Sequence, residues 1–495
     1  MNEQEIKRLK YRRQYIIGPD DIKCPFENVR ININDKYICY SHADLVTTEY
    51  SEGNKKIILL GDMYDYNNTN MMNIEIIRDL FIHDFNECLE KISEFAGRYV
   101  LIYCIGDDIK IMHDASACRK IFYAEKNGFI LCASTQHLLA KVANFRRTSN
   151  PDLLAYYNSS EFIDNLKSNI GDYTIYDEIR QVLPNHFLIV EPLKIVRYWP
   201  NQNLNALSPD ECVEQSVLMI KGYIEAAAKR YGLMIPVTSG YDSRILLSAT
   251  KNIAYKIFYY LNFSDHVKKT GEYKIPQKIL SRHNIEFNLL DYDQQVDKDF
   301  EKIYYENNPL ANEDFLSIIY NYYLRYSDKL NLPAGTIPII KGLYHSKSKE
   351  INSQLLSQLY NVEKFNIARQ FYKDWLNEAM EISDRFGINV FDLLYWEDRT
   401  CNWGTQVQLD KDIAQDEFVP FNSRKLIVTM LAYDEKRRKK PYFELNKEII
   451  RKLWPELLKY PFNPSFKHFI KEILIYLKLY EIVMKLQGRL KYRTS

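Results

Sequence analysis

The stretch Leu233–Leu247 reads LMIPVTSGYDSRILL, and it decides the fold of the second half of the chain. Its apolar first part predicts a buried strand, its small and hydroxyl residues predict a loop, and its last part predicts an amphipathic helix. A strand–loop–helix unit directs backbone N–H groups and the positive end of the helix dipole at an anion. Because Gly240 lets the backbone approach a phosphate closely, we expect a phosphate-binding loop at residues 238–243.

The side chains of this loop suit a nucleotide and its metal ion. Asp242 offers a carboxylate for the Mg²⁺ that accompanies ATP. Arg244 in the first helical turn, and more remotely Arg399, are the expected guanidinium partners of phosphate. The expected hydroxyl donors are Thr238, Ser239 and Ser243. The alternative is a plain buried strand followed by a capped helix, since Asp and Ser cap helices in many proteins.

The motif Thr-Ser-Gly-Tyr-Asp-Ser resembles the Ser-Gly-Gly-x-Asp-Ser pyrophosphate loop of asparagine synthetases and related ATP pyrophosphatases. In that family the enzyme adenylates a carboxylate, releases pyrophosphate and passes the acyl group to an amine. Thr238 lies where the first Ser would be, and Ser239 replaces the first Gly. The matching positions are Gly240, Asp242 and Ser243. The resemblance therefore implies a site for ATP and Mg²⁺ on this loop.

The resemblance extends along the rest of the chain. Residues 258–261 are similar to the next buried strand of the family, whose backbone meets adenine, which places Tyr259 and Tyr260 on the adenine side. Residues 396–399 and 418–426 resemble the family's E-R and P-F-x-x-x-x-L region. The implied fold is an α/β ATP pyrophosphatase (adenine nucleotide α-hydrolase-like) domain with a helical C-terminal part.

One family motif is altered in this chain. A sequence similar to Ser-Gly-Glu-Gly-Ser-Asp-Glu is expected after the next core strand, and residues 332–342 (LPAGTIPIIKG) correspond to it. Thr336 lies where the Glu would act as a base, and Ile339 lies where the Asp would bind a second Mg²⁺. Three explanations stay open: a shifted alignment, a base from elsewhere, or nucleotide binding without turnover. The general base is unassigned, and Lys467 and Arg399 are the candidates for stabilising developing phosphate charge, although an ordinary surface lysine is the simpler interpretation of Lys467.

The first part of the chain has the pattern of paired strands. Residues 95–103 and the segments after them resemble the core of class II glutamine amidotransferases, which implies an α+β Ntn-hydrolase-like sandwich. Working members carry a Cys directly after the initiator Met, whereas this chain has Asn2, and Leu60 replaces the Asn of the oxyanion hole. We therefore expect no glutaminase activity. A rescue by Cys24 or Cys39 is disfavoured because neither lies beside an evident His–Asp pair.

Length and composition set the outer limits. The 495 residues predict two domains, residues 1–204 and 205–495, with the boundary at a polar linker. The 66 basic and 65 acidic residues leave a net charge of +1, which argues against a nucleic-acid-binding protein. Eight dispersed cysteines without a C-x-x-C pair, and a polar N-terminus, favour the cytoplasm. Residues 469–486 predict a basic amphipathic helix, which either contacts an anionic membrane surface or packs on the domain, and packing is favoured.

These observations favour an ATP-dependent, amide-bond-forming ligase that adenylates a carboxylate on a small molecule, peptide or glycan. Without a glutaminase, its nitrogen would be ammonia or an amine, as in the related β-lactam synthetases and lasso-peptide cyclases, which close amides within one molecule. The alternative is a non-catalytic nucleotide-binding or regulatory partner of the same fold. A third class, a structural interaction module, predicts no nucleotide binding. A homodimer is compatible with each of them.

Overall fold

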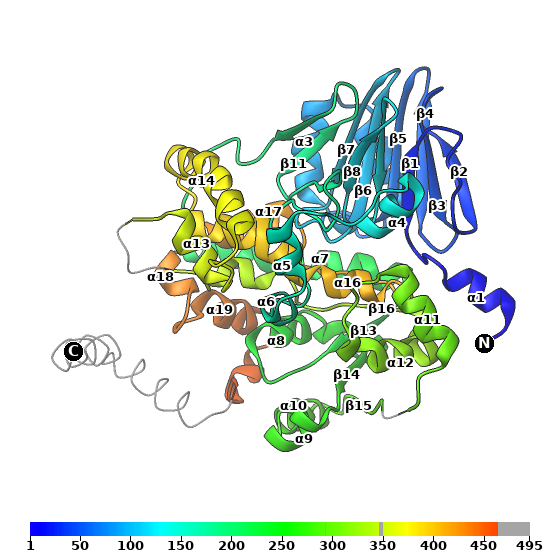
Figure 1. Ribbon diagram of the computed structural model, residues 1–495. Helices are drawn as coiled ribbons and strands as arrows, with labels where there is room; N and C mark the ends of the chain where they lie inside the picture. The colour runs from blue at the N-terminus through cyan, green and yellow to red at the C-terminus, as the bar shows by residue number, and fades with distance from the viewer. Residues whose placement is uncertain (293, 346–349, 464–495) are drawn as a thin grey trace.

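The computed structural model describes residues 1–292, 294–345 and 350–463, which form a β-rich part followed by a helix-rich part (Figure 1). Antiparallel sheets make up the first part, and a parallel sheet surrounded by helices makes up the second. This mixed α/β architecture agrees with the expected combination of sheets and helices. No helix within the described ranges is long and apolar enough to span a lipid bilayer.

The β-rich part consists of two six-stranded sheets in which every pairing is antiparallel. The first sheet has the order β10 (Arg180–Gln181), β8 (Phe122–Lys126), β9 (Phe129–Ala133), β1 (Tyr15–Gly18), β3 (Ile38–His42) and β2 (Asn28–Asn32). The second has the order β12 (Lys194–Arg197), β11 (His186–Ile189), β7 (Asp108–His113), β6 (Ala96–Ile105), β5 (Lys55–Tyr64) and β4 (Thr47–Glu52).

The alternation of side chains along β5 explains how the sheets stack. Ile58 and Leu60 point into the core between the two sheets, whereas Ile57 and Leu59 point outward against helices. Because both faces are covered, the strand is apolar throughout, as successive residues of a strand face opposite sides. The helices on this outer face are α2 (Asn73–Phe81) and α3 (Phe85–Lys91), and α4 (Gln136–Ala143) covers the other sheet. The result is a helix–sheet–sheet–helix sandwich.

The helix-rich part is built on a four-stranded parallel sheet. Its order is β15 (Asn288–Leu290), β14 (Phe258–Asn262), β13 (Gly232–Pro236) and β16 (Lys329–Asn331). Leu233 and Ile235 of β13 pack in one core cluster and Met234 packs in another, so helices bury both faces of the sheet. On one side lie α7 (Pro209–Arg230), α8 (Tyr241–Ala249) and α19 (Glu444–Leu453), and on the other α11 (Lys298–Asn307) and α12 (Leu316–Tyr326).

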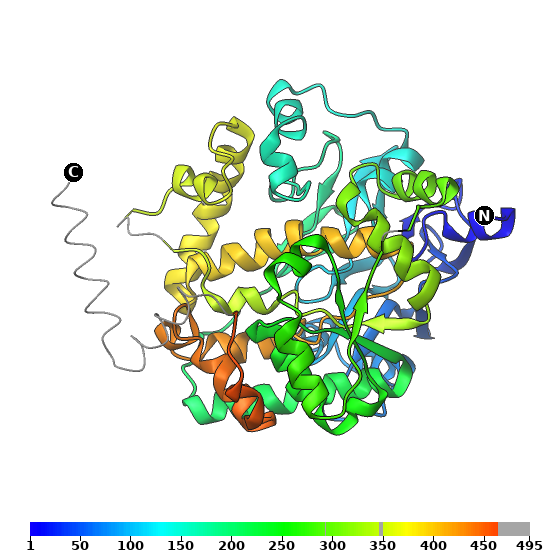
Figure 2. The same cartoon turned by 90° about the horizontal axis from the view of Figure 1, so that it is seen from below.

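The remaining helices surround this sheet, and α19 packs against α7 and α8 although it is far from them in sequence (Figure 2). Within the first part, α1 (Glu3–Leu9) precedes the sheets, and α5 (Pro151–Tyr157) and α6 (Ser160–Asp164) follow α4. Later elements are α9 (Asp265–Thr270), α10 (Lys274–Arg282), α13 (Ser353–Leu359), α14 (Asn366–Phe386), α15 (Val390–Leu394), the π-helix Tyr395–Gly404, α16 (Gln406–Lys411), α17 (Arg424–Leu431) and α18 (Glu435–Arg438).

The order of the parallel strands reverses direction at β13. The chain runs from β13 outward to β14 and β15, and then returns to β16 on the opposite side of β13. Ligands of open parallel sheets bind outside the carboxyl ends of the strands at such a reversal point, because the loops there diverge. The loops that follow β13 and β16 therefore frame the place where a ligand is expected.

A buried charged network joins the two parts. The guanidinium of Arg98, on β6, donates to both carboxylate oxygens of Asp412 over 2.6 and 2.9 Å and to Asp416 over 2.9 Å. Arg119 reaches the same Asp416 over 3.4 Å. Both arginine side chains are almost fully buried. Because buried charges are tolerated only when they are paired, this network fixes the sandwich on the helix-rich part.

Candidate functional site

The predicted strand–loop–helix order of the deciding stretch is confirmed. Strand β13 ends at Pro236 and helix α8 begins at Tyr241, with Gly240 as its N-cap in an extended conformation. A glycine cap has no side chain to satisfy the first N–H groups of the helix. Thr238 and Asp242 are each partly exposed, so the loop is not closed off from solvent. The loop lies at the carboxyl end of β13, where the strand order of the sheet reverses.

Two hydroxyl groups hold the loop in its bend. The Thr238 and Ser243 hydroxyls are 2.9 Å apart, and the backbone N–H of Thr238 donates to the Ser243 hydroxyl over 3.0 Å. The N–H of Gly240 donates to the Thr238 hydroxyl over 3.2 Å. Ser239 is 3% exposed, and its carbonyl accepts from the backbone N–H of Asn463 over 3.1 Å. The hydroxyls therefore shape the loop as well as being candidate donors to phosphate.

Asp242 is the ionisable group of the loop, and its carboxylate accepts a hydrogen bond from Lys341. The Lys341 ammonium lies 2.5 Å from Asp242 Oδ2, whereas Oδ1 is buried without a hydrogen-bond partner among the described residues. Burial raises the pKa of Asp242, and the charge of Lys341 opposes this rise. An acid with a perturbed pKa, one cation and an open oxygen is typical of a functional site.

The donor set suits one Mg²⁺ that is bound together with a nucleotide. Among the described residues there is no cluster of three or more His, Cys, Asp or Glu side chains that could hold a metal ion by itself. Mg²⁺ needs only one or two carboxylates when substrate phosphates supply further oxygens. Asp242, with its unpaired Oδ1, fits that role, so Mg²⁺ would arrive with the triphosphate.

Arg244 has a different role from the one expected. Its side chain is buried, and its guanidinium lies 3.9 Å from the centre of the Phe462 ring. It donates to four backbone carbonyls, those of Leu457, Tyr460, Ser239 and Pro461. The expectation that Arg244 neutralises phosphate is thus corrected: its donors tie the segment 457–463 to the start of α8.

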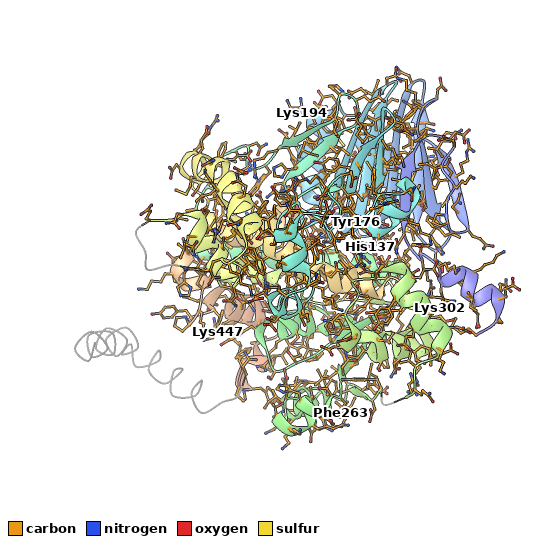
Figure 3. The ribbon with its side chains drawn as sticks, viewed as in Figure 1. His137, Tyr176, Lys194, Phe263, Lys302 and Lys447 are labelled. Carbon is orange, nitrogen blue, oxygen red and sulfur yellow. The ribbon has the colours of Figure 1, made fainter. Side chains whose placement is uncertain are left out.

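Aromatic stacking reinforces that tie. The ring of Tyr241 stacks on Phe462 with centroids 4.0 Å apart and planes 9° apart, and Phe443 packs beside it at 4.9 Å. The Lys447 ammonium, on α19, lies 5.9 Å from the Tyr241 ring (Figure 3). The variable residue of the loop motif therefore anchors the helix start, and the segment 460–463 covers one side of the loop.

The expected adenine-side residues lie on strand β14, and their side chains are buried. Tyr259 is fully buried and its hydroxyl bonds to Thr250 over 2.8 Å, while the Tyr260 hydroxyl donates to Asn331 over 3.0 Å. Pro236 pairs with Tyr260, so these tyrosines lie inside the sheet, level with β13, and not at its open edge. The end of β14 nearest the loop is Asn262. The next residue, Phe263, packs on Tyr273 near α9 and α10 (Figure 3).

The segment of the altered acidic motif lies beside the loop, because its last residues reach Asp242 through Lys341. Residues 332–336 follow β16, and a 3₁₀ turn, Ile337–Lys341, comes next. Thr336 is 3% exposed with its hydroxyl unpaired, and Ile339 is completely buried in the core. Ile339 is therefore a core residue, and it offers no carboxylate for the metal-binding role of the family's Asp. Lys341 belongs to this segment, but the sequence alone predicts no role for it because a single lysine does not form a motif.

Arg399, the other guanidinium candidate, lines a cleft. It donates to Asn165 over 3.0 Å and lies 4.6 Å from the centre of the Trp403 ring. The cleft has a volume of about 320 Å³, and two acids, Glu161 and Asp164, line it together with Arg399 and Tyr395. Burial raises the pKa of Tyr395, and the charge of Arg399 opposes this rise. Lys467 and the helix expected at 469–486 lie outside the described residues.

The N-terminal residues do not form a nucleophile site. Asn2 caps helix α1 by accepting from the N–H of Glu5 over 2.9 Å, and the Met1 ammonium pairs with Asp297 on the helix-rich part. Leu60 lies in the core between the sheets. The thiol of Cys39 is buried, and burial raises its pKa, which disfavours the reactive thiolate. Burial likewise raises the pKa of the half-buried Cys24.

Comparisons with known proteins give one kind of likeness. No family model and no curated protein matches the chain. Among solved structures, the chain is similar to glutamine phosphoribosylpyrophosphate amidotransferase from B. subtilis complexed with ADP and GMP, with a TM-score of 0.24 and 11% identity over 53% of this chain. A structure of the allosteric regulatory enzyme of purine biosynthesis gives a TM-score of 0.25 and 11% identity over 52% of this chain. The matches span 63% and 61% of those chains, and such low scores mark a partial likeness.

Proposed function

We propose that this chain is an ATP-dependent, amide-bond-forming ligase of the asparagine synthetase type, which adenylates a carboxylate and transfers the acyl group to ammonia or an amine. The observation that carries the proposal is the Thr238–Ser243 loop, which follows the parallel strand β13 at the reversal point of the sheet. A glycine cap, hydroxyl side chains and a carboxylate at a helix start are the groups that bind a phosphate chain and its metal ion.

Each part of the site has an assigned task under this proposal. The N–H groups at the start of α8 would bind the phosphate chain, and Asp242 would hold Mg²⁺. The strand β14, with Tyr259 and Tyr260, would lie on the adenine side. The carboxylate to be activated would bind in the cleft that contains Tyr395 and the cation Arg399. Bound Mg²⁺ would supply charge neutralisation for the pyrophosphate that leaves.

The proposed fold assignments follow from the same reasoning. The parallel sheet with its loop corresponds to an ATP pyrophosphatase domain, and the helix–sheet–sheet–helix part corresponds to an Ntn-hydrolase-like domain that serves as a scaffold. We expect no glutaminase activity because Asn2 is a helix cap and Leu60 is a core residue. The nitrogen donor would be ammonia, or an amine on the substrate. The location that fits this chemistry is the cytoplasm, where ATP is abundant.

The exchange of radiolabelled pyrophosphate into ATP tests the proposal. A panel of carboxylates is needed, including amino acids, peptides and uronic acids. Exchange that depends on one class of carboxylate is the expected result, because adenylation is reversible before the amine attacks. An Asp242→Ala variant should lose the exchange. If no carboxylate supports exchange although ATP binds, the ligase proposal is wrong.

A second candidate function has its own supporting observation. Ile339 is buried where the family's second acid would lie, and the hydroxyl of Thr336 is an inadequate base. A nucleotide-binding partner protein without turnover would have this arrangement. Under this alternative, Mg-ATP binds to the full chain and is recovered unchanged after long incubation with every carboxylate and amine tested.

A further inference from the structure

Lys341 ends a short segment whose neighbouring residues are buried and hydrogen-bonded. It is the last residue of the 3₁₀ turn after β16, and Gly342 follows it in the left-handed region at φ +54°. The preceding Ile340 is buried, and its carbonyl accepts from Arg438, which is itself paired with Asp392 over 2.5 Å. The ammonium is thereby directed at the loop after β13, where it meets Asp242 over 2.5 Å.

The two oxygens of Asp242 show that this pair is incomplete. Both oxygens of the buried Asp412 accept from Arg98, whereas Asp242 Oδ1 has no hydrogen-bond partner among the described residues. The Lys341 side chain is 15% exposed and that of Asp242 is 24% exposed, so solvent or a ligand reaches both. Neither group is locked as Arg98 and Asp412 are, at 3% and 4% exposure. An ion pair of this kind separates when a ligand offers the ammonium and the carboxylate partners of higher charge.

Lys341 is a cation that contacts the loop through its ammonium group. A triphosphate brings about four negative charges, and stabilising them in a partly dry site requires fixed cations. The terminal nitrogens of Arg244 donate to four backbone carbonyls, and those of Arg438 donate to Ile340 and Asp392. The Nε atoms of both arginines are buried without a partner among the described residues, so neither guanidinium is as exposed as the Lys341 ammonium. The carboxylate that would bring a second Mg²⁺ is replaced by the buried Ile339.

We propose that Lys341 is the phosphate-binding cation of this site and that it replaces the charge of a second, carboxylate-bound Mg²⁺. Without nucleotide, Lys341 rests on Asp242. With Mg-ATP, Asp242 turns to the one Mg²⁺, and the ammonium moves to a phosphate oxygen. This inference rests on the proposed nucleotide binding and adds its metal dependence: most of the affinity for the phosphate chain comes from a residue of the protein.

Calorimetric titration of the full chain with ATP, and with inorganic pyrophosphate, tests the inference in Mg²⁺ and in EDTA. Wild type should bind both ligands in both buffers. Lys341→Met should weaken binding about tenfold or more in each buffer, as expected for the loss of a charged hydrogen bond. Lys341→Arg should restore much of it. Asp242→Asn releases the lysine, so it should tighten binding in EDTA while it weakens binding in Mg²⁺.

The matched control is Lys452→Met, which removes an ammonium from a 3.0 Å ion pair with Glu214 on the surface, and it should bind as wild type does. Thermal unfolding of each variant checks that it is folded. If Lys341→Met binds as tightly as wild type, or Asp242→Asn weakens binding in EDTA, the inference is overturned while nucleotide binding stands. If wild type binds neither ligand in either buffer, the proposed function itself is wrong, and the inference falls with it.

Discussion

Asp62, on strand β5, and Asp242, in the first turn of helix α8, each pair with a basic side chain, but their surroundings differ. Asp62 accepts from Asn73 over 3.0 Å and Arg230 over 3.3 Å at one oxygen, and from Tyr231 over 2.8 Å at the other. Within the described residues, Asp242 accepts from Lys341 at Oδ2 and has no hydrogen-bond partner at Oδ1. The first acid is therefore part of the structure, and the second is available for a ligand.

Asp62 belongs to the contact between the two parts, whereas Asp242 lies at a helix start next to a loop. Arg230 and Tyr231, at the end of helix α7 of the second part, cover the end of strand β5 at Asp62. A Cβ at Gly61 would lie 2.1 Å from the carbonyl oxygen of Arg98 on the paired strand β6, so this part of the strand is tightly packed. Nothing comparable fills the bend at Gly240, where the nearest atom to a Cβ is 3.3 Å away.

The largest effect is expected where the two parts meet. Arg98→Ala leaves Asp412 and Asp416 buried without their main cation, so it should lower the free energy of unfolding by about 3–5 kcal/mol. Denaturant titration measures this loss. The control is Arg437→Ala, which removes an exposed pair with Glu444 and should cost less than about 1 kcal/mol. Equal losses for the two variants would mean that the buried network does not hold the parts together.

Asp410 gives a case between the two acids, with full hydrogen bonding but no bound cation. It accepts from Asn308, Gln406 and the N–H of Asn312, and burial raises its pKa to about 6. A raised pKa means that its contribution to stability is present below pH 4 and is lost as the pH rises through 6. Asp410→Asn should therefore gain up to about 3 kcal/mol over wild type at pH 8.

Thermal and denaturant unfolding between pH 4 and pH 8 measures this difference. The advantage of Asp410→Asn should be small near pH 4, where the wild-type carboxyl is protonated in the native state and the pH is close to its ordinary pKa of 3.8. A difference that does not change with pH would show that the carboxyl group titrates normally. It would also show that an acid bound only by amides is as well stabilised as one bound by arginine.

Asp62→Ala and Asp242→Ala should lower the free energy of unfolding by different amounts. Removing Asp62 leaves the Tyr231 hydroxyl and the Arg230 guanidinium short of an acceptor, so it should cost about 2 kcal/mol of stability. Removing Asp242 should change stability by less than about 1 kcal/mol, because its carboxylate is only half satisfied. Parallel urea titrations compare them. A larger loss for Asp242→Ala would make it a structural residue.

The deciding stretch was predictable because its local signals agree. Apolar β13, a glycine and hydroxyl residues, and an apolar helical face all favour strand, loop and helix in the same order. The roles of Arg244 and Tyr260 were not predictable, because their partners are carbonyls and side chains remote in sequence. Lys341 was missed for the same reason: its meaning comes from the strand order, which brings the loop after β16 to Asp242.

Binding of Mg-ATP to the full chain, measured by calorimetry for wild type and Gly240→Val, tests the central claim most directly. Gly240 has φ −77°, so valine fits the backbone, but its side chain occupies the approach that a phosphate needs. Wild type should bind Mg-ATP saturably. Gly240→Val should lose this binding and still unfold at nearly the same temperature as wild type. Equal binding by the two proteins, or none by wild type, would contradict it.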